Sequence, residues 1–120
     1  VLEVAVKSID DAYGLTVIDV AGNELVLPRL GLEPGRSLRI SIHARDVSIT
    51  RTRPTDTSIL NVIPATVSEL TRHGESRILV RLNAKGFPLL SRITRKSADL
   101  LNLHIGDDVF AQVKSVASLE

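Results

Sequence analysis

The chain has 120 residues, a formal net charge of +1 and no cysteine. So small a net charge excludes a strong general attraction to nucleic acid or anionic lipid, and the lack of cysteine excludes disulfides and thiol chemistry. Hydrophobic residues make up 43% of the chain but aromatic residues only 2%, so its core has to be built from valine, isoleucine and leucine. Such cores are typical of small, tightly packed β structures.

The first part of the chain predicts short strands separated by turns. Apolar residues alternate with polar or small ones, which is the period of a half-buried strand. The predicted strands cover residues 2–6, 16–20, 24–27, 36–43 and 47–50. Glycine and proline predict breaks at 21–23 and 31–35, and residues 43–46 are expected to form a single turn.

The second part predicts a polar linker, more strands and one helix. Residues 51–57, RTRPTDT, are the expected linker. Strands are predicted at 62–70, 76–82, 87–93 and 109–116, with Pro64 at an edge or first position. The helix is expected to begin at Thr94 or Ser97, to bury Leu100 and Leu101, and to end before Gly106. The two phenylalanines of the predicted strands, Phe87 and Phe110, are expected to fill the core.

This pattern predicts an all-β fold of two small OB-like β-barrel subdomains with one short helix. The linker places the boundary between residues 53 and 54, which gives subdomains 1–53 and 54–120. No apolar run approaches the roughly 20 residues that span a bilayer, so no direct membrane insertion is expected. The start lacks methionine and any signal sequence, as expected of a piece of a longer polypeptide.

Motifs for catalysis are missing from the sequence. It contains no phosphate-binding loop, no serine-hydrolase elbow and no zinc-protease helix, so this stretch is not expected to be an enzyme. His43 with Asp46, or His104 with Asp107 and Asp108, could seed a metal site. Turn formation explains these residues better, and no metal is expected. A nucleic-acid-binding barrel is disfavoured because stacking aromatics are scarce.

Three stretches resemble a known family. TSILN at 57–61, followed by VIPATVSEL, resembles the opening of a Mop-type molybdate-binding module, and ITRKSADLLNLHIGDDVFAQVKSV at 93–116 resembles its ending. LRISIHARDVSIT at 38–50 is similar to the companion segment of TOBE domains. The chain thus resembles the C-terminal regulatory TOBE/Mop domain of the ATPase subunit of bacterial molybdate importers, with 1–53 as the first TOBE subdomain and 54–120 as the Mop-type one.

The resemblance implies a cytoplasmic location, peripheral to the inner face of the cell membrane. The implied partners are a second copy of the domain, the parent ATPase domain, whose phosphate loop lies upstream, and the importer's membrane subunits. No cofactor is implied. The implied ligand is molybdate or tungstate, dianions that accept hydrogen bonds, so a selective site should offer donors. The donors implied are Ser58, Asn61, Lys114 and Ser115.

One residue departs from the family pattern. The family usually has an arginine where this chain has Leu60, which removes a forked donor suited to an oxyanion. Three alternatives stay open: affinity is reduced, Arg92 or Arg95 substitutes, or the domain is a structural dimerisation module without a site. A free-standing molybdate-storage protein is a further alternative. The sequence does not distinguish molybdate from tungstate, or give the number of sites or the direction of regulation.

Overall fold

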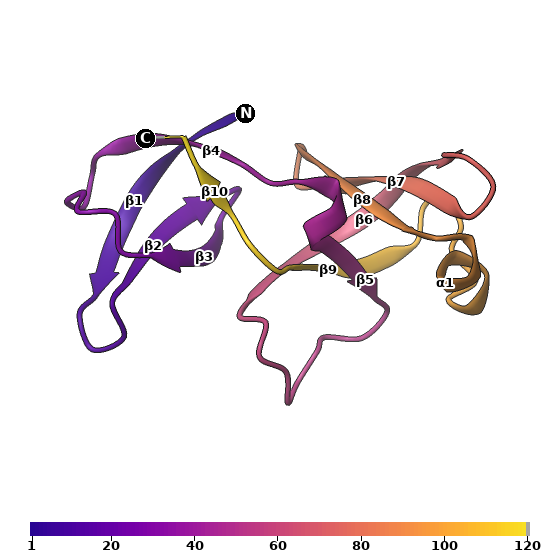
Figure 1. Cartoon of the computed structure of the whole chain (residues 1–120), viewed down its shortest axis with the longest axis horizontal. Coiled ribbons are helices and arrows are strands. Elements are labelled where there is room, and N and C mark those ends of the chain that lie inside the picture. Colours follow the sequence, from indigo (N-terminus) through magenta and orange to yellow (C-terminus); the bar gives the residue numbers. More distant parts are fainter. Residues whose placement is uncertain (120) are drawn as a thin grey trace. The chain divides into compact units, whose positions relative to one another are not determined.

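The computed structural model describes residues 1–119, which form two five-stranded sheets and one short α-helix (Figure 1). All strand pairs are antiparallel. The chain divides into two compact units, one made of Val1–Ile42 with the segment that begins at Ser115, and the other of His43–Lys114. The predicted all-β class with one short helix is confirmed.

The first unit is a twisted sheet with strand order β10-β4-β1-β2-β3. Its strands are β1 (Leu2–Asp10), β2 (Leu15–Val20), β3 (Asn23–Pro28), β4 (Ser37–Ser41) and β10 (Ala117–Ser118). The β2–β3 hairpin turns through Ala21 and Gly22, both at positive φ (51° and 83°), as a tight two-residue turn requires. Inward-facing aliphatic residues, among them Ile18, Leu25 and Ile40, build its core.

The second unit contains the 3-10 turn η1 (Ala44–Asp46), β5 (Val47–Thr50), β6 (Asn61–Arg72), β7 (Arg77–Ala84), β8 (Phe87–Thr94), α1 (Arg95–Leu100) and β9 (Asp108–Val113). The strand order is β5-β9-β6-β7-β8. The sheet curls so that its two outer strands, β5 and β8, meet. Where they meet, the Ser91 hydroxyl in β8 donates a hydrogen bond of 2.5 Å to the Val47 carbonyl in β5. This contact closes an OB-like barrel around aliphatic side chains.

We expect Ser91→Ala to destabilise the second unit by about 1–3 kcal/mol, because it leaves the buried Val47 carbonyl without this donor. Ser68→Ala is the matched control, since the Ser68 hydroxyl also donates to a backbone carbonyl, that of Arg81, but at an exposed position. Urea unfolding followed by circular dichroism measures both. Equal losses for the two variants would show that Ser91 does not close the barrel.

Several local predictions are confirmed and several are wrong. Thr94 caps α1, its side chain accepting a hydrogen bond from the Ser97 N–H, as predicted. Leu100 is 76% exposed rather than buried, because so short a helix turns only part of its surface to the sheet. Phe87 and Phe110 are half-buried and do not enter the core, because their neighbours in β8 and β9 occupy the inward positions. Pro64 lies inside β6, where only β9 pairs with it, because β7 joins β6 from Thr66 onward.

The units are grouped differently from the predicted subdomains 1–53 and 54–120. β5 pairs with β9 and therefore belongs to the second unit, so the predicted linker joins β5 to β6 within that unit. The predicted strand 109–116 ends at Val113, and β10 pairs with β4 in the first unit. Both differences arise from pairing between segments far apart in the sequence, which a local pattern does not encode.

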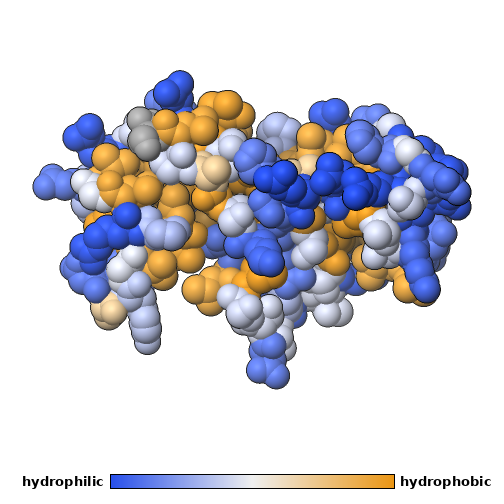
Figure 2. All heavy atoms as spheres, viewed as in Figure 1, coloured by the Kyte–Doolittle hydropathy of each residue, from blue (hydrophilic) through white to orange (hydrophobic). Residues whose placement is uncertain are grey.

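The visible surface of the second unit is mainly hydrophilic over β7, β8 and α1, whereas the first unit shows apolar and polar side chains side by side (Figure 2). Among the described residues, no helix is long and apolar enough to cross a bilayer.

Candidate functional site

Lys114 lies just beyond the C-terminal end of β9, an inner strand of the second sheet. It follows Val113, the last residue of β9, and Val113 pairs with Val47 of β5 on one side and with Asn61 of β6 on the other. The Lys114 backbone N–H donates a hydrogen bond of 2.7 Å to the Asp46 carbonyl, which holds the main chain at this point. Because Val113 is buried and side chains alternate, the exposed Lys114 side chain lies on the outer face.

The TSILN segment lies beside this strand end. Asn61 begins β6 opposite Val113, the last residue of β9, so Leu60 directly precedes this last pair on one strand and Lys114 directly follows it on the other. Leu60 is 69% exposed. Ser58 is exposed in the preceding loop and, three residues from Asn61, lies at most about 10 Å from it along the chain. The 57–61 segment therefore leads into β6 at the end of the sheet where β9 stops before Lys114.

Asn61 differs from the other sequence-predicted donors because it is only 6% exposed. Its side chain lies on the inward face of β6, together with Ile63 and Ala65. This position suits an amide that fixes the start of the strand and the loop before it. Between the two roles that the sequence left open, shaping the loop and donating to a ligand, burial favours shaping.

Ser115 is exposed and follows Lys114 directly in the chain, but it belongs to the first unit. The other three predicted residues, Ser58, Asn61 and Lys114, belong to the second unit. Of the two arginines considered as substitutes for the missing one, Arg95 donates a hydrogen bond of 2.8 Å to the Glu75 carbonyl. Arg92 follows Ser91, whose hydroxyl bonds to Val47 of β5, the partner of Val113.

An arginine clamp that sequence reasoning missed holds the other end of β9. The Arg51 guanidinium donates hydrogen bonds of 2.6 Å to the carbonyls of Leu101 and Asn102, and one of 2.8 Å to the Asp107 carboxylate. The same carboxylate oxygen accepts a 2.8 Å bond from the His104 N–H. Arg51 and then this N–H hold the pKa of Asp107 below its ordinary value of 3.8. The only sequence signal was an arginine in a polar segment.

Three of the residues considered as metal ligands, His104, Asp107 and Asp108, make hydrogen bonds within the protein. The Asp107 carboxylate is bound by Arg51, the Asp108 carboxylate accepts a hydrogen bond from Thr66, and His104 Nδ1 lies 2.9 Å from the Asn102 carbonyl. Across residues 1–119, no three His, Cys, Asp or Glu side chains gather in a way that could hold a metal ion.

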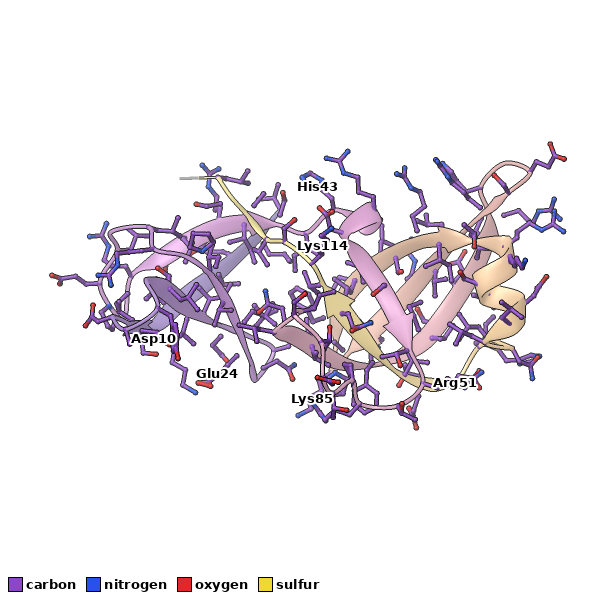
Figure 3. The ribbon with its side chains drawn as sticks, turned by 60° about the horizontal axis from the view of Figure 1, so that its bottom comes forward. Asp10, Glu24, His43, Arg51, Lys85 and Lys114 are labelled. Carbon is purple, nitrogen blue, oxygen red and sulfur yellow. The ribbon has the colours of Figure 1, made fainter. Side chains whose placement is uncertain are left out.

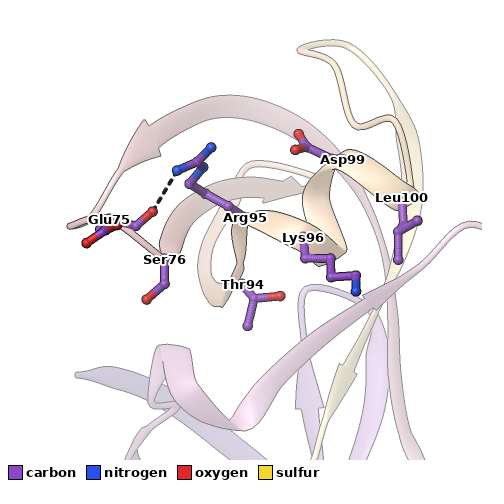
Figure 4. Close-up of a pocket in the computed structure, with 7 residues that line it drawn as sticks. All are labelled: Glu75, Ser76, Thr94, Arg95, Lys96, Asp99 and Leu100. Atoms are coloured by element: carbon purple, nitrogen blue, oxygen red, sulfur yellow. Dashed lines mark hydrogen bonds between the residues drawn. The ribbon is translucent and has the colours of Figure 1, made fainter.

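A groove of about 590 Å³ lies against α1, at the opposite end of β6 from Asn61 (Figure 4). Two cations, Arg95 and Lys96, and two acids, Glu75 and Asp99, line it together with Ser76, Thr94 and Leu100. Opposite charges in equal number do not favour an anion. The groove therefore does not replace the candidate site at the start of β6 and the end of β9, which is called the strand-end site below and contains Ser58 and Lys114.

Comparison with known proteins identifies the family. The TOBE domain model matches residues 57–119. The chain therefore belongs to the TOBE domain family, and the resemblance found in the sequence is confirmed.

Two curated relatives are similar over nearly the whole chain. The molybdenum import ATP-binding protein ModC of Albidiferax ferrireducens is 46% identical over 119 residues, covering 99% of this chain and 32% of the relative. ModC 1 of Azotobacter vinelandii is 44% identical over 120 residues, covering 99% and 33%. The chain thus spans about a third of the length of these relatives.

Among solved structures, the cytoplasmic molybdate-binding protein ModG, crystallised with molybdate bound, matches with a TM-score of 0.78 and 19% identity. The match covers 96% of this chain and 92% of that one. At this identity the likeness shows a shared fold.

Proposed function

We propose that this domain binds molybdate or tungstate at the strand-end site and thereby regulates an importing ATPase of which it is a part. The observation that supports the proposal is the pairing of Asn61 with Val113, because β6 begins just after the Ser58 loop at the end of the sheet where β9 stops before Lys114. The relatives at 44–46% identity are named as molybdenum import ATP-binding proteins, which supports this ligand class. The parent ATPase, the importer's membrane subunits and the cytoplasmic membrane face are part of the proposal.

The chemistry of the strand end suits a tetrahedral dianion. Ser58 offers a hydroxyl, Lys114 an ammonium group, and both are exposed. Molybdate oxygens accept hydrogen bonds, so donors without lone pairs, such as an ammonium group, favour them. One lysine neutralises half of a dianion, so we place the site where two copies of the domain meet, with Ser58 and Lys114 of each copy facing the anion.

The alternative is a module that only dimerises, which the exposed leucine at position 60 favours because it removes a donor.

Molybdate that binds only the native state adds about 2.7 kcal/mol to the free energy of unfolding when its concentration is a hundred times Kd. We therefore expect the melting temperature to rise with molybdate and tungstate and to rise much less with sulfate, whose shorter bonds make a smaller anion. Sedimentation velocity should show a dimer. A dimer whose melting temperature does not change with millimolar molybdate would support the structural alternative and overturn the proposed binding function.

A further inference from the structure

The loop between β5 and β6, residues 51–60, is attached to β9 and the connection before it at two places. Arg51 binds the end of α1 and Asp107, the residue just before β9, through three hydrogen bonds. The guanidinium carbon of Arg53 lies 4.8 Å from the centroid of the Phe110 ring, in the middle of β9. Both contacts lie before Lys114 along the chain, and Figure 3 shows Arg51 and Lys114 at opposite ends of β9.

These contacts occupy both arginines nearest to the proposed site in sequence. The Arg51 guanidinium donates its hydrogen bonds to two carbonyls and a carboxylate, so its charge is paired and most of its N–H donors are used. Arg53 lies over an aromatic face, a cation–π contact. Neither side chain is arranged to approach an anion beside Lys114, so the contribution of these residues to binding has to pass through the loop.

We propose that Arg51, assisted by Arg53, is a positioning residue for the oxyanion site: it fastens the loop that carries Ser58 to the same strand that presents Lys114. This inference rests on the proposed function. β6 fixes the loop at Asn61, β5 fixes its other end at Thr50, and Arg51 strengthens that second attachment. With both ends held, Ser58 is restricted in its distance from Lys114, and less conformational entropy is lost when an anion binds.

Two variants separate positioning from general stability. Arg51→Ala removes the clamp, while Arg51→Lys keeps the charge but not the fork. Arg72→Ala is the control, an exposed arginine of the same unit in the β6 strand. We expect Arg51→Ala to raise the molybdate Kd about tenfold, as loss of an orienting partner does at metal sites. Arg51→Lys should recover part of the loss, and Arg72→Ala should change nothing.

Amide hydrogen exchange in the absence of ligand gives a readout that does not depend on molybdate. We expect Arg51→Ala to speed exchange at Ser58 and Ile59 and to leave the core strands protected. Unchanged exchange in the loop would overturn the inference, as would wild-type molybdate affinity in Arg51→Ala. Faster exchange throughout both β6 and β9 would assign Arg51 a purely structural role and also overturn it. If the wild type itself binds no molybdate, the proposed function fails, and the inference about binding fails with it.

Discussion

Replacing Lys114 with alanine is expected to weaken molybdate binding by about 10- to 100-fold and to leave the fold intact. A hydrogen bond to a charged group contributes about 1.5–3 kcal/mol, and each 1.4 kcal/mol corresponds to a factor of ten in Kd. The fold should tolerate the change because the side chain is exposed and the contact that anchors this position is made by the backbone N–H, which alanine retains. Isothermal titration with molybdate measures Kd, and thermal unfolding without ligand measures stability.

Lys96→Ala is the matched control for this prediction. Lys96 is an exposed lysine of the same unit, but it lies on α1 at the groove and not at the end of β9. Both variants lower the net charge by one, so a general electrostatic effect would weaken binding equally in the two. Loss in Lys114→Ala alone locates the anion at the strand end. Equal Kd values for Lys114→Ala and the wild type would remove Lys114 from the site.

Local sequence signals predicted most of the strands because each depends on neighbouring residues. The turn at Ala21 and Gly22 requires positive φ at two successive residues, and the cap at Thr94 requires one hydroxyl three residues before an N–H. The assignment of β5 to a unit depended instead on β9, more than 50 residues further along the chain. A period of two shows that a strand has one buried face, but it does not show which strand is its neighbour.

The candidate site was predictable to a similar degree. The residues that carry the family resemblance marked the 57–61 segment and Lys114. Strand pairing shows that β6 begins after this segment at the end of the sheet where β9 stops before Lys114. The sequence did not show that Asn61 faces inward, since its burial follows from the phase of β6. It also did not show the Arg51 clamp, because the partners of this side chain are two main-chain carbonyls and one carboxylate some 50 residues away. Contacts between a side chain and a distant backbone leave no pattern in composition or spacing.

Replacing Leu60 with arginine is expected to tighten molybdate binding by about 10- to 100-fold. Position 60 directly precedes Asn61, which pairs with Val113 just before Lys114, and the leucine there is 69% exposed, so a longer polar side chain fits without repacking the core. The guanidinium would add two parallel donors to a site that has one cation per chain. It would also repel Lys114 in the free protein, and the anion would relieve that repulsion on binding.

Leu60→Lys and Leu60→Gln separate the causes of this gain. Lysine adds the charge without the fork, and glutamine adds a donor without the charge, so a requirement for forked geometry predicts the order arginine, lysine, glutamine for affinity. Titrations with molybdate at two salt concentrations measure the order and its electrostatic part, because exposed charges are screened by salt. If Leu60→Arg leaves the molybdate Kd unchanged while the dimer stays intact, position 60 does not face the anion.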